Sequence, residues 1–122
     1  MAIVTVLYWF VGLLCGIGSI NWGLERFVGI DLVVLIKRKT RQRGIDYLLY
    51  LAIGIAGALQ VLMPAHIINL ISGIGALNWG IYAHFSFNLV DYLAVQTKVH
   101  NIDKLFYVLI SVCGMMQIFL LF

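Results

Sequence analysis

The chain has 122 residues, of which 63% are hydrophobic and only 11% are charged, and its formal net charge is +3. Ordinary soluble domains carry about 25% charged residues, so this composition excludes a typical water-soluble fold and indicates one small domain in lipid. All charged residues lie within positions 25–46 and 91–104, which leaves three long uncharged stretches.

The uncharged stretches predict four membrane-spanning helices. A span needs about 20 mainly apolar residues, and the middle stretch is long enough for two spans that turn at Pro64. The apolar runs are continuous and lack the alternation that is typical of barrel strands. We expect spans over residues 3–24, 45–63, 65–85 and 102–121.

An internal repeat is visible when the sequence is shifted by 57 residues. This shift aligns Asn21-Trp22-Gly23 with Asn78-Trp79-Gly80, and 16 of 47 aligned positions are identical, which shared apolar composition alone does not explain. We therefore predict an all-α membrane protein built from two tandem two-helix units, residues 1–57 and 58–122, with the second span running slightly past the first unit. A pseudo-two-fold axis along the membrane normal would relate the units.

Basic residues predict the orientation of the chain in the membrane. Five of them crowd the loop after the first span, and Lys98 and Lys104 follow the third span. Loops rich in Lys and Arg tend to face the cytoplasm, so we expect loops 37–44 and 94–101 there and both termini on the opposite side.

Two short apolar stretches, residues 27–36 and 85–93, are too short to cross a bilayer, and we expect interfacial or re-entrant helices there. Asp31 and Asn88 are the predicted N-caps, with Asp91 at the third helical position as in a capping box. The alternative for Asp31 is a proton or cation site, because carboxylates within membranes often serve that purpose. Capping is favoured, since Asn88 cannot ionise.

Further carboxylates lie at the predicted starts of the second and fourth spans. Asp46 and Asp103 would there face the positive end of the helix dipole and its unpaired amide groups. A buried carboxylate that relays protons is the alternative interpretation.

The Asn-Trp-Gly motif closes both odd-numbered spans. We expect each indole ring at the headgroup boundary with its N–H reaching water, and each following glycine to let the chain change direction. The asparagines need partners at that depth, either backbone carbonyls or an amide on a neighbouring helix. A paired-asparagine solute site on the pseudo-axis is the alternative.

No arrangement of residues indicates catalysis or metal binding. Cys15 and Cys113 align with Ser72 and Ala56 of the other unit, so we interpret them as small apolar fillers. The three histidines show no ligand spacing, and no serine has a candidate base nearby on its helix. We therefore expect neither an enzyme nor a cofactor. Gln60 and its counterpart in the second unit are expected to add hydrogen bonds between helices.

The loop after the first span carries the strongest exposed signal, the basic residues Lys37, Arg38, Lys39, Arg41 and Arg43. Its charges set topology and attract anionic lipid, and they would also favour docking of an acidic partner. We expect the partners to be the bilayer, anionic lipid, and another copy of the chain or a membrane or capsid protein, with no specific nucleic acid.

The Gly-x-Asn-Trp-Gly run is followed in both units by a short segment with Asp31 or Asn88 before Leu-Val, and then by a span containing Tyr and Gly. This pattern resembles the YuzA-like family of small membrane proteins, whose domain (domain of unknown function 378) has no assigned function. The resemblance implies fold and membrane location and brings no catalytic residue. Members are mostly short bacterial proteins with one unit, and the family also occurs in large DNA viruses with an internal membrane.

Two functions follow as hypotheses. The first is a non-enzymatic membrane scaffold that packs with itself or a partner and presents the basic loop, in a bacterial cytoplasmic membrane or in a virion membrane under the capsid. The second is a small channel or transporter for an ion or polar solute that uses Asn21, Asn78 and Asp31.

Overall fold

The computed structural model describes residues 2–122, and over this range all of the regular secondary structure is helical. In chain order the elements are α1 (Ala2–Gly23), a short π-helical turn η1 (Leu24–Val28), α2 (Leu32–Thr40), α3 (Ile45–Leu62), α4 (Ile67–Phe85), α5 (Leu89–Thr97) and α6 (Ile102–Leu121). The four long helices begin and end within a few residues of the predicted spans. The short helices α2 and α5 begin inside the two predicted interfacial stretches and extend four residues past them.

Three segments are long and apolar enough to cross a membrane, namely Ala2–Val28, Ile45–Leu62 and Ile102–Leu121. The fourth long helix, α4, is not among them, because Asn69, Asn78 and His84 lower its hydropathy. This helix packs against α1, α3, α5 and α6. The fold is therefore that of a helical protein suited to a membrane, in which α4 contacts each of the other long helices.

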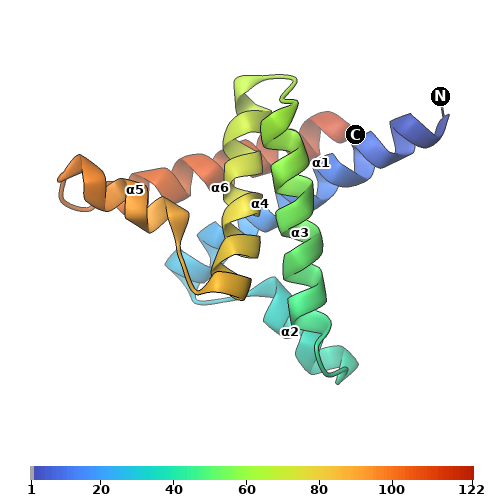
Figure 1. The fold of residues 1–122 in the computed structure, drawn as a ribbon, viewed down its shortest axis with the longest axis horizontal. Coiled ribbons are helices and arrows are strands. Elements are labelled where there is room, and N and C mark those ends of the chain that lie inside the picture. The colour runs from blue at the N-terminus through green and yellow to red at the C-terminus, as the bar shows by residue number, and fades with distance from the viewer. Residues whose placement is uncertain (1) are drawn as a thin grey trace.

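Two pairs of long helices form the body of the molecule. Helices α3 and α4 form an antiparallel hairpin, and α1 packs chiefly along α6. In Figure 1 these two pairs cross. The turn between α3 and α4 and both ends of the chain point toward the top and right of the view, whereas α2 and α5 lie at the bottom and left.

Backbone conformation repeats along the chain with the same spacing as the sequence. Six residues among 2–122 have a positive φ angle. They form three pairs, and the members of each pair are separated by 57 positions: Gly29 with Ser86, Arg41 with Lys98, and Gly44 with Asn101. Left-handed conformations are rare for residues other than glycine, so this coincidence indicates that corresponding segments form the same turns: two of the pairs end helices, and Gly44 and Asn101 precede α3 and α6.

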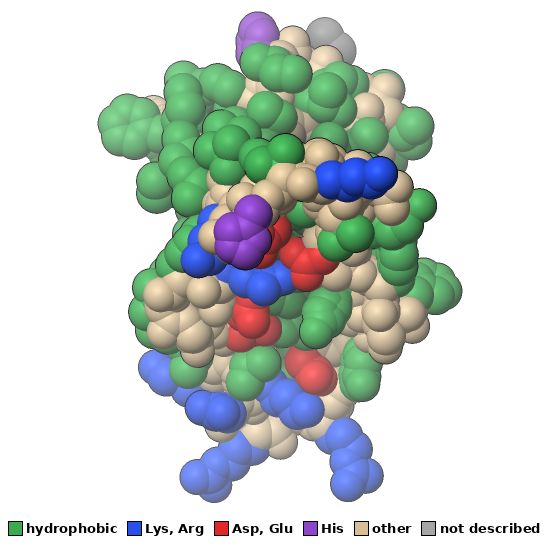
Figure 2. Space-filling model, turned by 90° about the vertical axis from the view of Figure 1, so that its left-hand side faces the viewer, with side chains coloured by type: hydrophobic (Ala, Val, Ile, Leu, Met, Phe, Trp, Pro, Cys, Tyr) green, Lys and Arg blue, Asp and Glu red, His purple; other side chains and the backbone are tan. Residues whose placement is uncertain are grey.

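The outer surface of the bundle is mainly apolar. Side chains such as Val4, Leu48, Ile55, Val108 and Phe119 are exposed on the long helices. In Figure 2 the hydrophobic side chains cover the upper part of the face shown, and charged side chains gather lower down. Such a large apolar surface is rare on soluble monomers, and it fits contact with lipid.

Glycines allow the two helices within each pair to approach each other closely. A Cβ atom at Gly54 would lie 2.7 Å from the Cα atom of Gly80, and one at Gly57 would lie 2.2 Å from the backbone nitrogen of Leu77. At Gly114, which corresponds to Gly57, a Cβ atom would lie 2.8 Å from the carbonyl oxygen of Gly16. Contact between helices through small residues is the usual basis of helix association in membranes.

We expect Gly57→Ala to destabilise the hairpin, because the added methyl group would meet the backbone of α4, which cannot move independently. Overpacking of this kind costs about 1–3 kcal/mol. Thermal unfolding in detergent, followed by circular dichroism, measures the loss. Gly12→Ala is the milder comparison, since its nearest neighbour is a side-chain atom, the amide nitrogen of Gln117 at 3.1 Å, and not backbone. Equal stability of the two variants would contradict this packing.

Candidate functional site

Two tryptophans lock α1 to α4 at the centre of the molecule. The indole N–H of Trp22 donates to the carbonyl oxygen of Gly75 at 2.8 Å, and that of Trp79 donates to the carbonyl oxygen of Gly18 at 2.7 Å. The two rings stack with their centroids 3.9 Å apart, and they are 1% and 5% exposed. Each helix therefore supplies the acceptor for the other helix's donor.

The prediction that each indole N–H reaches water is wrong. A buried indole needs a partner for its N–H. Here the partner is a carbonyl oxygen of the facing helix, at Gly75 for Trp22 and at Gly18 for Trp79. A Cβ atom at Gly75 would lie 2.4 Å from Ile110 and one at Gly18 would lie 2.5 Å from Ile53, so glycine leaves room for side chains of α6 and α3 beside these bonds.

The prediction that Gly23 and Gly80 change the direction of the chain is also wrong. Gly23 has helical angles, φ −63° and ψ −43°, and Gly80 lies inside α4. Both serve close packing instead: a Cβ atom at Gly23 would lie 2.2 Å from the Ser111 hydroxyl oxygen. The chain turns six residues after each of these glycines, at Gly29 and Ser86.

Asn21 and Asn78 fasten the two short helices to the long ones. The Asn21 side chain donates to Asp31 at 2.9 Å and accepts from the backbone N–H of Leu32 at 2.7 Å. Asn78 makes the matching bonds to Asn88 at 2.9 Å and from the N–H of Leu89 at 2.6 Å. Each asparagine thus binds the start of its own short helix, and the structure does not join the two as a pair.

Asp31 and Asn88 are the N-cap residues of α2 and α5, as predicted. Asp31 accepts from the N–H groups of Val33 and Val34 at 2.9 and 3.4 Å. Asn88 accepts from the N–H of Asp91 at 3.0 Å. Asp91 occupies the third helical position of α5, but its carboxylate is directed toward other side chains.

A tyrosine lies beside each cap. The Tyr50 hydroxyl donates to the Asp31 carboxylate. Beside the cap of α5, Tyr107 accepts from the Asn88 amide at 2.8 Å and donates to the Asp91 carboxylate at 2.8 Å. The sequence shifted by 57 residues aligns Tyr50 with Tyr107, and their shared place as the sixth residue of α3 and of α6 was the available signal.

Arg26 is a functional candidate that the sequence analysis missed. Its guanidinium lies over the Tyr107 ring, 4.5 Å from the centroid. It also approaches the Asp91 carboxylate at 2.5 Å and the Tyr107 hydroxyl at 3.2 Å. A weaker contact of 3.9 Å joins it to Glu25. Arg26 therefore neutralises the carboxylate on the α5 side of the molecule.

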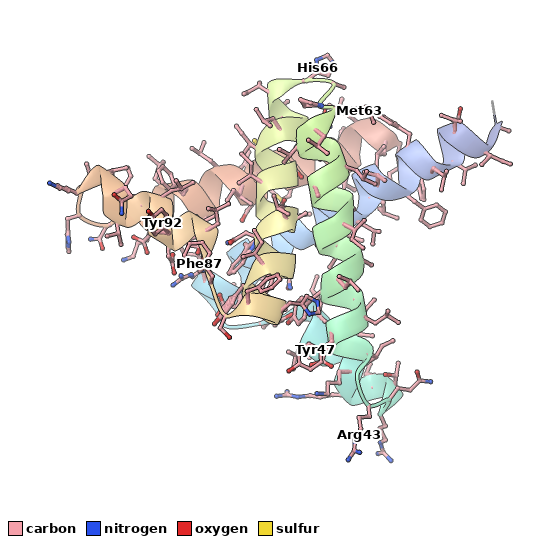
Figure 3. The ribbon with its side chains drawn as sticks, viewed as in Figure 1. Arg43, Tyr47, Met63, His66, Phe87 and Tyr92 are labelled. Carbon is pink, nitrogen blue, oxygen red and sulfur yellow. The ribbon has the colours of Figure 1, made fainter. Side chains whose placement is uncertain are left out.

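A polar cavity of about 570 Å³, hereafter the axial cavity, lies where the α1, α3 and α4 ends meet the short helices. Its walls carry four carboxylates, Glu25, Asp31, Asp46 and Asp91, and one cationic side chain, that of Arg26. Five aromatic rings complete much of the remaining wall, those of Trp22, Tyr47, Tyr50, Trp79 and Tyr82. Figure 2 shows acidic side chains gathered on this side with basic ones around them, and Figure 3 places Tyr47 near the lower ends of α3 and α4.

The two carboxylates predicted at helix starts lie in the first turns of α3 and α6, as expected. One oxygen of Asp46 lies 3.3 Å from the Lys37 ammonium. The other, Oδ1, is buried and has no hydrogen-bond partner among residues 2–122. Asp46 faces the axial cavity, whereas Asp103 lies in the other unit.

The predicted basic cluster spans the end of α2 and the turn that follows. Lys37, Arg38 and Lys39 occupy the last turn of α2, where the helix dipole favours cations. Arg41 ends the helix in a left-handed conformation. Arg43 points away from the bundle at the bottom of Figure 3.

The remaining buried polar side chains pair with one another between helices. Gln60 and Gln117 exchange two hydrogen bonds, of 3.0 and 2.6 Å. The Ser19 hydroxyl lies 3.1 Å from that of Ser72 and donates to the Ser72 carbonyl oxygen at 2.6 Å. Both cysteines are free and buried. Within residues 2–122 no three His, Cys, Asp or Glu side chains are placed to hold a metal ion.

The fold and the apolar helices define an all-helical protein that is suited to be integral to a membrane. Residues 64–122 match the family described as a domain of unknown function (DUF378). This segment contains α4, α5 and α6, and the match supports the family resemblance drawn from the sequence.

One curated relative is the uncharacterized protein RP169 of Rickettsia prowazekii (strain Madrid E). It is 45% identical over 47 residues, which is 38% of this chain and 50% of the relative. The chain thus covers half of the relative's length. No solved structure matches the chain.

We expect the stacked indole pair to give an exciton couplet in the far-ultraviolet circular dichroism spectrum. Because the couplet needs both rings, Trp22→Phe or Trp79→Phe alone should abolish it. Each variant should also lose about 1–3 kcal/mol of stability with its hydrogen bond and packing. Trp9→Phe is the control, since the rings beside Trp9 are those of Phe10 and Phe122. A couplet that survives either central substitution would contradict the stack.

Proposed function

We propose that this chain is a non-enzymatic membrane scaffold with four spans, built as two tandem two-helix units. The observation that carries the proposal is that the interior polar side chains bind one another or the backbone. Ser19 bonds to Ser72, Gln60 to Gln117, and both central indoles to facing carbonyls. Interior chemistry of this kind holds helices together, and it presents an apolar surface and a basic end to the surroundings.

The tandem arrangement has support from contacts that recur at a spacing of 57 residues. The bonds of Asn21 and of Asn78 are matched, as are the two indole bonds to glycine carbonyls on the facing helix. Positive φ angles recur at the same spacing. The family match to residues 64–122 covers a segment of the size of one such unit. In this proposal α4 also crosses the membrane, and its contacts with the neighbouring helices shield its polar residues from lipid.

The basic cluster gives the scaffold its attachment point. Five cationic side chains, Lys37, Arg38, Lys39, Arg41 and Arg43, lie together beyond the apolar helices. Their partners would be anionic lipid, an acidic membrane or capsid protein, or another copy of the chain. The bacterial origin of the relative favours a bacterial cytoplasmic membrane over a virion membrane. Loops 37–44 and 94–101 would face the cytoplasm.

Vesicle docking tests the proposed attachment. We expect protein in phosphatidylcholine vesicles to capture labelled phosphatidylglycerol vesicles at low salt, because each basic residue near an anionic surface contributes about 1 kcal/mol. Replacing the five basic residues of the cluster by glutamine should abolish capture, which a flotation assay measures.

The matched control carries Lys98→Gln and Lys104→Gln, which remove cations from the other loop and should leave most capture intact. Capture should also fall as salt is added, because exposed charges are screened. Unchanged capture by the five-residue variant, or none by the parent protein, would contradict the attachment role.

A channel or transporter for an ion or small polar solute is the second candidate, and the axial cavity favours it. The cavity is acidic and open at one end of the bundle. Against it, Asn21 and Asn78 are each engaged with a short helix, and the Gln60–Gln117 pair fills the interior nearer the other end. Solute flux in reconstituted vesicles that Asp31→Asn abolishes would favour this candidate over the scaffold.

A further inference from the structure

The axial cavity is bordered by two unequal halves. On one side, the guanidinium of Arg26 covers the Tyr107 ring and pairs with Asp91. With the 57-residue spacing, Ala83 corresponds to Arg26, and Tyr50 corresponds to Tyr107. Both Ala83 and Tyr50 line the cavity. Where one half of the cavity wall carries the Arg26 guanidinium, the other half therefore carries the methyl group of Ala83.

The carboxylate of the Ala83 half has no cation of its own. Asp31 accepts hydrogen bonds from neutral groups, the Asn21 amide, two backbone N–H groups and the Tyr50 hydroxyl, and within residues 2–122 it forms no ion pair. Its counterpart Asn88 is neutral, and the nearby charge of that half is neutralised by Arg26. Asp31 is thus the carboxylate whose negative charge a bound cation would balance.

We propose that the axial cavity binds a small organic cation of the alkylguanidinium class, seated over Tyr50 beside Ala83 and facing Asp31. Arg26 in the other half is the internal example of the same contact, with a guanidinium on a tyrosine face and against a carboxylate. This inference rests on the tandem repeat proposed above, and it adds a ligand class to that proposal.

The walls of the cavity suit such a ligand better than they suit a metal ion. Aromatic faces attract cations that shed water easily, and the stacked pair of Trp22 and Trp79 contributes to the wall. Guanidinium is weakly hydrated and planar, so it stacks on tyrosine and also donates to a carboxylate. The volume of about 570 Å³ accommodates a small ligand. Metal ions need several converging ligands, which residues 2–122 do not provide.

Tryptophan fluorescence provides the test, because the two cavity tryptophans report on a bound cation. Protein carrying Trp9→Phe is purified in mild detergent and titrated with ethylguanidinium chloride, with sodium chloride holding ionic strength constant. We expect a saturable change in fluorescence. The parent protein without guanidinium but with equal sodium chloride should show none.

Two variants localise the binding to Asp31. Asp31→Asn keeps a cap of the kind that Asn88 provides, so it should fold, and it should weaken binding by at least about tenfold. Ala83→Arg supplies a covalent guanidinium at the place that matches Arg26, so it should also suppress binding. Asp103→Asn, outside the cavity, is the control and should bind like the parent protein.

The outcomes separate this inference from the proposed function. No saturable signal in the parent protein, or equal binding by Asp31→Asn and Ala83→Arg variants that retain their helical spectra, would overturn the cation site. Vesicle docking through the basic cluster involves different residues and would be unaffected by either result. Loss of docking with intact ethylguanidinium binding would instead overturn the scaffold proposal and leave the cation site standing.

Discussion

The structure depends on one constraint: polar groups in a lipid-embedded interior must find their partners within the protein. Trp22 and Trp79 meet it reciprocally, since each donates to a backbone carbonyl on the helix that carries the other. That exchange joins α1 to α4, and the glycines at the acceptor positions leave room for Ile53 and Ile110, which a Cβ atom there would meet first. Helix α4 also packs along α3, and α1 packs along α6. Unpaired indole N–H groups at this depth would cost several kcal/mol in free energy.

Much of the fold could be predicted from local sequence, because uncharged runs of sufficient length define long helices and Asp31 and Asn88 are good caps. The partners of the central tryptophans could not be predicted. An indole at the end of an apolar run is equally compatible with the headgroup region and with the interior, and only the opposing helix decides which environment it meets. The roles of Gly23 and Gly80 were predicted wrongly for the same reason. A glycine that packs against another helix looks the same in the local sequence as a glycine that allows a turn. Fold and membrane character are supported, whereas tandem units and sidedness stay proposals.

The axial cavity arises where the short helices leave the bundle. Asparagine bonds hold the start of each short helix against a long one, so the charged residues of α2 and α5 gather at one end of the body. Positions that are 57 residues apart carry different side chains here. Arg26 and Ala83 occupy matching positions, and the carboxylates lie at Asp91 in one half and Asp31 in the other. This pairing could not be predicted from local sequence, because Arg26 and Asp91 are 65 positions apart.

Cross-linking between α1 and α4 tests the central claim most directly. Ser19 and Ser72 have hydroxyl oxygens 3.1 Å apart, so cysteines at both positions, with Cys15→Ser and Cys113→Ala, should form a disulfide under mild oxidation. Trypsin cuts the exposed basic loop between them, so the two fragments should then migrate together until a reductant is added. Fragments that separate without reductant, or that link only between two chains, would contradict the crossing of α1 over α4.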